Sequence, residues 1–142
     1  MTSSKLPKAS SDEALKAFHS GYNCAQSVVK VFADALSYDE NELVSNVAGL
    51  GGGRFHGICG AVAGAYKVLE MFCSIGKEEE SELCLETLME SFRRQFQQLH
   101  NTDQCKTLLS GETKHPKNDV LSICERCIVD AVEVVNEMVA KF

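Results

Sequence analysis

The sequence has no apolar run long enough to cross a bilayer. Its longest uncharged apolar stretch, Ile58 to Tyr66, is far shorter than the roughly 20 residues that a transmembrane helix needs. The formal net charge is −6, which disfavours binding to nucleic acid or to an acidic membrane surface. Residues 1–8 lack the apolar core of a secretory signal. We therefore expect a cytoplasmic protein with mostly reduced thiols, without nucleic-acid or membrane partners.

Long alternation of apolar and polar residues, the mark of an exposed β-strand, is also missing. The 142 residues are 44% hydrophobic and contain no low-complexity tract, so they can bury a core. No repeat or linker divides the chain. We predict one domain over residues 1–142, with residues 1–9 as a flexible tail. The predicted fold class is all-α, a compact helical bundle of about five to seven helices.

Capping residues and apolar positions at helical spacing set the expected helices. Asn23, Asp39 and Ser122 are typical N-cap residues, and Ser122 has Glu125 three residues later, as a capping box requires. The expected helices run from about Ser10 to Gly21, Cys24 to Leu36, Asp39 to just before Gly49, Cys59 to Ile75, Lys77 to His100, Asp103 to Leu109, and from Ser122 onward.

Four of the seven cysteines lie where an expected helix begins, namely Cys24, Cys59, Cys105 and Cys124. A capping signal precedes each of them: Asn23, the end of a glycine-rich run, Thr102 and Ser122, in the same order. The first turn of a helix carries free N–H donors and partial positive charge, which stabilise a thiolate and lower its pKa. Metals, clusters and disulfide exchange all require thiolates. The placement therefore predicts cysteine chemistry.

The glycine-rich run at residues 49–60 lacks the spacing of a dinucleotide-binding or phosphate-binding loop. Two interpretations stay open. The glycines can let the backbone approach a buried group and offer it N–H donors, or they can form a simple flexible loop. His56 is either a ligand or proton donor or an ordinary surface histidine. Under the first interpretation, the candidate cofactor-binding residues are Gly52, Gly53, His56, Gly57 and Gly60.

The other three cysteines, Cys73, Cys84 and Cys127, share helical stripes with apolar residues, so we expect them to pack in the core. Cys124 and Cys127 form a Cys-x-x-Cys. This motif lacks the preceding strand of a thioredoxin site, the second pair of a zinc ribbon and the histidine of a haem attachment site.

The order Cys24, then Cys59-Gly60-Ala61-Val62-Ala63-Gly64, then Cys105 and Cys124 resembles the C_GCAxxG_C_C family of redox-active proteins. The similarity covers residues 13–138. It implies an all-α domain with a redox role. A similar domain accompanies haem segments in split-Soret cytochromes, where an iron–sulfur centre is implied. This chain has no haem motif, so the resemblance extends to the cysteine domain alone.

The leading hypothesis is that Cys24, Cys59, Cys105 and Cys124 bind one iron–sulfur cluster, [2Fe–2S] in type. The protein would then transfer electrons to an unidentified redox partner protein. One alternative is a metal-free thiol–disulfide or peroxide-handling enzyme with Cys24 and Cys59 as its active pair. Another is a structural zinc site on an interaction module. The sequence leaves open whether the protein is an enzyme, and its apolar helix faces would tolerate a homodimer.

Overall fold

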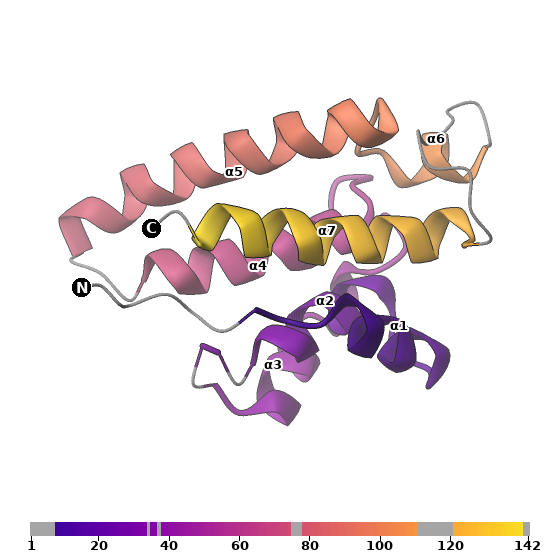
Figure 1. Cartoon of the computed structure of the whole chain (residues 1–142), viewed down its shortest axis with the longest axis horizontal. Helices are drawn as coiled ribbons and strands as arrows, with labels where there is room; N and C mark the ends of the chain where they lie inside the picture. The colour runs from indigo at the N-terminus through magenta and orange to yellow at the C-terminus, as the bar shows by residue number, and fades with distance from the viewer. Residues whose placement is uncertain (1–7, 34, 37, 75–77, 111–120, 141–142) are drawn as a thin grey trace.

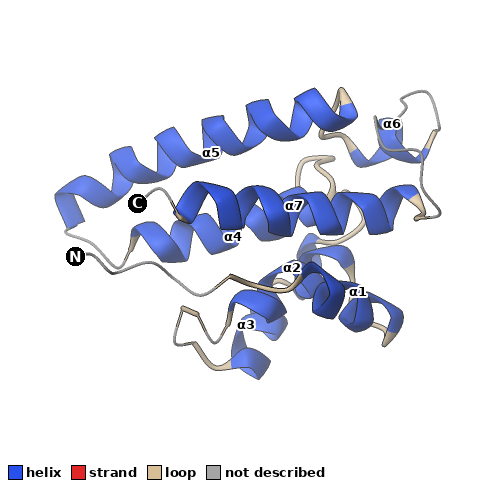
Figure 2. Ribbon diagram, in the orientation of Figure 1, coloured by secondary structure: helices blue, strands red, loops and turns tan. Residues whose placement is uncertain are grey.

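The computed structural model describes residues 8–33, 35–36, 38–74, 78–110 and 121–140, without the side chains of residues 78–83. Within these ranges the protein is all-α, as predicted, with seven α-helices and no strand (Figure 2). The helices are α1 (Ser11–His19), α2 (Cys24–Phe32), α3 (Glu40–Asn46), the 3₁₀ helix η1 (Ala48–Leu50), α4 (Gly60–Cys73), α5 (Glu78–His100), α6 (Cys105–Leu109) and α7 (Ile123–Val139).

The predicted N-caps of α2, α3 and α7 are confirmed. Asn23 caps α2 with a two-way capping box: its side chain accepts the N–H of Gln26, and the Gln26 side chain accepts the N–H of Asn23. Ser122 and Glu125 form the same box at α7. The Asp39 side chain accepts the N–H of Glu42, the third residue of α3. Local sequence therefore fixes where these helices begin.

Some predicted boundaries differ from the structure. Helix α2 ends at Phe32 instead of Leu36; Ala33, Ala35 and Leu36 lie in turns, and Leu36 is still buried. Helix α6 begins at Cys105 with Gln104 as its N-cap, and Thr102 accepts the N–H of Gln104 without capping the helix itself. The expected helix end at Ile75 and the expected helix start at Lys77 lie outside the described residues.

Residues 1–7 of the predicted tail also lie outside the described residues. Ala9, near its end, is held on α7 by two hydrogen bonds. Its N–H donates to Asn136 Oδ1 at 2.9 Å, and its carbonyl accepts from Asn136 Nδ2 at 2.8 Å. The described chain is therefore attached to the bundle from this point onward.

Three long helices, α4, α5 and α7, lie side by side and contact one another (Figure 1). The short helices α1, α2 and α3 pack against one side of this layer, where α1 touches α7 and α2 touches α4. Fully buried side chains from the long helices fill the space between them, among them Leu69, Phe92, Phe96, Ile128 and Val135. No helix in the described part of the chain is both long and apolar enough to cross a membrane.

Small residues let α4 approach α2 very closely. Residues 60–65 are all buried. A Cβ added at Gly64 would lie 2.7 Å from the carbonyl oxygen of Ala25 and 3.0 Å from its Cα. Such distances are too short for any side chain, so the backbones meet here because Gly64 has none. This contact places the first turn of α2 beside the first turn of α4.

We predict that Gly64→Ala lowers the free energy of unfolding by about 1–3 kcal/mol, because the added methyl group pushes α2 away from α4. Gly49→Ala is the matched control, since a Cβ there meets nothing within 4 Å. That variant should stay within about 0.5 kcal/mol of the wild type. Urea unfolding followed by circular dichroism measures both. Equal stability of the two variants would contradict the packing described here.

Candidate functional site

The structure brings Cys24, Cys59, Cys105 and Cys124 together from four separate helices. Cys24 and Cys105 are the first residues of α2 and α6, Cys59 is the N-cap of α4, and Cys124 is the second residue of α7. In each of the six possible pairs, one thiol acts electrostatically on the pKa of the other. Cys59 is buried, and the other three are partly exposed. The four predicted residues therefore share one site close to the surface.

The glycine loop packs its backbone against two of these cysteines. A Cβ added at Gly60 would lie 2.9 Å from the Cβ of Cys24, and one added at Gly53 would lie 3.0 Å from the Cβ of Cys105. Gly53 also has a φ of +80°, a conformation that side chains rarely adopt. The loop thus approaches the cysteine site closely, in agreement with the first interpretation of the glycine run, although the two cysteines that it meets are partly exposed rather than buried.

Hydrogen bonds fasten this loop to the segment before α6. The N–H of Cys59 donates to the carbonyl of Asp103 at 2.7 Å, and the N–H of Cys105 donates to the carbonyl of Gly57 at 2.8 Å. Ile58 and Gln104 form an isolated antiparallel bridge between the two bonds. These contacts fix Cys59 and Cys105 relative to each other.

The remaining candidate cofactor-binding residues, Gly52 and His56, are exposed. A Cβ added at Gly52 would meet nothing within 4 Å. The His56 ring packs edge-on against Phe55 and lines an open pocket together with Tyr66 and Arg93. A role for either residue in binding a cofactor stays a prediction.

Cys24 and Cys124 are neighbouring thiols, and each has the largest effect on the pKa of the other. Hydrogen bonding to Cys24 lowers the pKa of Cys124 to about 7, against burial and the charge of Glu125. The same interaction raises the pKa of Cys24, and burial and the neighbouring thiols raise it further. At neutral pH, about half of the Cys124 thiol is therefore ionised, while Cys24 keeps its proton.

Cys59 has its own thiol partner, Cys127. Their hydrogen bond is the main cause that lowers the pKa of Cys59; burial opposes it, and the N–H groups of Val62 and Ala61 assist. Cys105 differs, since burial first and then Cys59 and Cys124 raise its pKa. The expectation that helix starts lower the pKa of all four thiols is therefore wrong for Cys24 and Cys105. The interaction with Cys124 and then burial raise the pKa of Cys24, and burial and then like charges raise that of Cys105, against the helix dipole.

Cys127 is buried in the core, as expected, at 2% exposure, but its surroundings are polar. His100 Nδ1 lies 4.0 Å from its sulfur, and His100 Nε2 lies 2.8 Å from Asp130 Oδ2. Sequence reasoning assigned no role to His100 or Asp130. The helical spacing of Phe92, Phe96 and His100 could have indicated a buried histidine, because His100 lies on the same face of α5 as the two phenylalanines and is equally buried.

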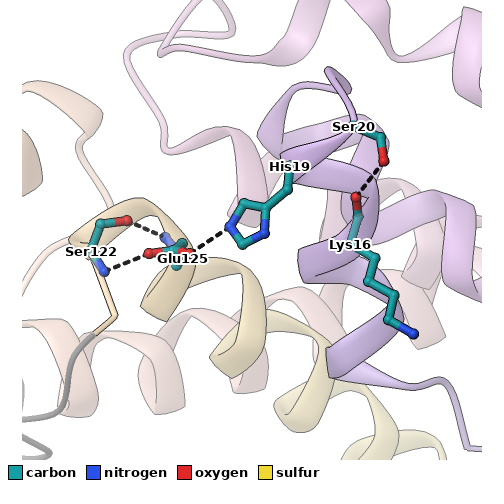
Figure 3. A network of polar contacts seen from close by, with 5 residues as sticks. All are labelled: Lys16, His19, Ser20, Ser122 and Glu125. Carbon is teal, nitrogen blue, oxygen red and sulfur yellow. Dashed lines mark hydrogen bonds and ion pairs between the residues drawn. The ribbon is translucent and has the colours of Figure 1, made fainter.

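A second polar contact that sequence reasoning missed ties α1 to the start of α7 (Figure 3). His19 Nε2 lies 2.6 Å from Glu125 Oε2. The N–H of Ser122 is the main cause that lowers the pKa of Glu125, and the His19 side chain adds to it. Glu125 follows Cys124 directly, so this contact helps to hold that cysteine in place.

Cys73 is buried in the core, as expected, and Cys84 is partly buried against it. They are not free thiols, because they form a disulfide between the end of α4 and α5. Cys73 lies thirteen residues beyond Gly60 on α4. A helix rises about 1.5 Å per residue, so this disulfide is on the order of 20 Å from the four-cysteine site. The two groups of cysteines are therefore separate in space.

Within the described residues, no group of three or more His, Cys, Asp or Glu side chains is arranged to hold a metal ion. The thiols instead affect one another's pKa most strongly in two pairs, Cys24 with Cys124 and Cys59 with Cys127.

The fold and site define an all-α protein with a convergent cysteine cluster at its helix starts. Residues 22–138 match the family model described as "Putative redox-active protein (C_GCAxxG_C_C)". The chain belongs to this family, and the predicted resemblance is confirmed. No curated protein and no solved structure matches the chain.

We predict that Cys124 in the reduced, metal-free protein reacts with iodoacetamide with an inflection near pH 7, because thiolate forms above its pKa of about 7. Cys24→Ala should move the inflection to higher pH by removing the hydrogen-bond donor. Cys105→Ala should leave it unchanged, since Cys105 does not set that pKa. Peptide mass spectrometry of timed samples measures the rate. An inflection near the ordinary cysteine value in the wild type would contradict the pairing with Cys24.

Proposed function

We propose that this protein transfers electrons through an iron–sulfur cluster bound by Cys24, Cys59, Cys105 and Cys124. One observation carries the proposal: four cysteines from four helix starts lie in mutual electrostatic contact at one site. Four thiolates are the ligand set of [2Fe–2S] clusters, and membership in a family described as redox-active agrees with it.

The surroundings of the site suit a negatively charged, sulfur-rich group. Glycine at positions 53 and 60 leaves the backbone close to Cys105 and Cys24, where any other residue would crowd the thiols. The N–H groups of Ala61 and Val62 already favour the charged form of Cys59. N–H groups near ligand sulfurs also tune the potential of a cluster.

A bound cluster would supply one-electron chemistry, and the chain's own residues hold it and control access to it. Cys24, Cys105 and Cys124 are partly exposed, which puts the site near the surface where a redox partner protein can approach. Cys59 lies deeper and is fixed through the Asp103 carbonyl. Electron exchange would therefore occur on the exposed side of the cluster.

A second candidate is thiol–disulfide chemistry without metal. The observation that favours it is the Cys24–Cys124 pair, in which Cys124 has a pKa of about 7. A partly exposed thiolate with a proton-donating neighbour is the arrangement of a reactive cysteine. The structure thus favours Cys124 as the partner of Cys24 over the predicted partner, Cys59.

We predict that anaerobically reconstituted protein absorbs visible light with matching iron and acid-labile sulfide. Cys59→Ser and Cys105→Ser should lose the absorbance, because each removes one of four ligands. Cys84→Ser is the control, since Cys84 belongs to the remote disulfide and should not affect the spectrum.

Each other outcome of this experiment has a clear meaning. An unchanged spectrum in both Cys59→Ser and Cys105→Ser would contradict the proposed ligands. Colourless, metal-free wild-type protein would favour thiol–disulfide chemistry. Zinc without iron or sulfide would favour a structural zinc site.

A further inference from the structure

The Cys59–Cys127 pair is a second redox candidate that the proposed cluster does not explain. Cys59 is the N-cap of α4, Cys127 lies on α7, and these helices pack together. Each thiol has a larger effect than any other group on the pKa of its partner, so the two side chains lie close together. Only 5% of Cys59 and 2% of Cys127 is exposed. Cys127 is not one of the four proposed ligands, so its contact with Cys59 needs a separate reason.

Two buried polar side chains, His100 and Asp130, lie next to the sulfur of Cys127. His100 and Asp130 are 1% and 4% exposed, and the Phe96 ring stacks on the His100 ring at 4.5 Å. A carboxylate only accepts hydrogen bonds, so the contact with Asp130 places the ring proton on Nε2 and turns Nδ1 toward Cys127.

Packing alone does not account for this chain of residues. Arg126 Nη2 lies 3.6 Å from the other Asp130 oxygen, so histidine, aspartate and arginine are buried together. Burying such groups is costly, and apolar side chains of similar size stabilise a core as well or better. The arrangement resembles the nucleophile–base–orienter sets in which a third group fixes the second.

We infer that Cys59 and Cys127 are a redox-active thiol pair that hydrogen peroxide oxidises to a disulfide, with His100 and Asp130 positioning the Cys127 sulfur. The inference goes beyond the proposed function and concerns the protein without a cluster, in which Cys59 is free to react. Because both cysteines are almost fully buried, only a small oxidant can reach their sulfurs. Hydrogen peroxide is close to water in size, whereas a disulfide substrate is too bulky.

The reaction balances as two steps. The sulfur of Cys59 attacks one peroxide oxygen, so an S–O bond forms, the O–O bond breaks and one water leaves, giving a sulfenic acid. The sulfur of Cys127 then attacks the Cys59 sulfur, so the S–S bond forms, the S–O bond breaks and a second water leaves. The two thiols lose two electrons and two protons, and the peroxide takes up both.

The test maps disulfides in reduced, cluster-free protein treated with one equivalent of hydrogen peroxide. Free thiols are blocked in denaturant, and linked peptides are identified by mass spectrometry. We expect a Cys59–Cys127 link in the wild type and in the matched control Cys105→Ser. Cys127→Ser should lose the link and accumulate Cys59 sulfenic acid that dimedone traps. A wild type that links only Cys24 with Cys124, or Cys24 with Cys59, would overturn the inference.

His100 is tested as a positioning residue by how oxidised Cys59 divides between two products. His100→Leu should lower the rate of Cys59–Cys127 linkage by about tenfold or more and raise the trapped sulfenic acid, because the Cys127 sulfur is no longer held. His100→Asn, whose amide can occupy the Nδ1 position, should restore part of the linkage. Equal linkage in His100→Leu and wild type would contradict the role of His100.

Failure of this inference and failure of the proposed cluster are distinguishable. Cys127→Ser should reconstitute visible absorbance like the wild type if the cluster uses the four proposed ligands. A wild type that binds a cluster but forms no Cys59–Cys127 link after the cluster is removed would overturn the thiol pair alone. A wild type that forms the link but never binds a cluster would support the pair and overturn the cluster.

Discussion

The close contact between α2 and α4 is the constraint on which the site depends. Gly60 and Gly64 are buried in α4. The backbone of α2 occupies the space of a side chain at Gly64, and the Cys24 side chain and the Gly51 backbone occupy that at Gly60. Because Cys24 starts α2 and Cys59 caps α4, this contact brings the first two cysteines together. The bridge between the glycine loop and Gln104 then adds Cys105, and the contact of α1 with α7 secures Cys124.

Electrostatics limit what this geometry can do without a cofactor. Four thiolates in one place repel one another, and helix N-termini offset only part of that repulsion. In the Cys24–Cys124 and Cys59–Cys127 pairs, the raised pKa of Cys24 and of Cys127 keeps a proton on one sulfur of each pair. In the proposed cluster, iron would compensate the charge of four thiolates at once. In the proposals for the metal-free protein, the same pairs would carry two-electron chemistry.

The sequence predicted the parts of this protein that local interactions control. Asn23 with Gln26 and Ser122 with Glu125 form their capping boxes through neighbouring residues, so their sequence spacing is sufficient to identify them. The start of α6 was less predictable, because Thr102 bonds to Gln104 and tertiary contacts set where that short helix begins.

Contacts between distant residues could not be obtained in this way. The Cys73–Cys84 disulfide and the pairing of His100 with Asp130 each join separate helices. In the sequence these residues stand among apolar residues at helical spacing, so the pattern predicts only that they are buried. Even the pKa directions of the thiols depend on which sulfur donates to which. The sequence by itself determined the family, the helices and the starts of those helices that have a side-chain cap. Only the tertiary structure decided the partners of each cysteine, because those partners come from chain segments that folding alone brings together.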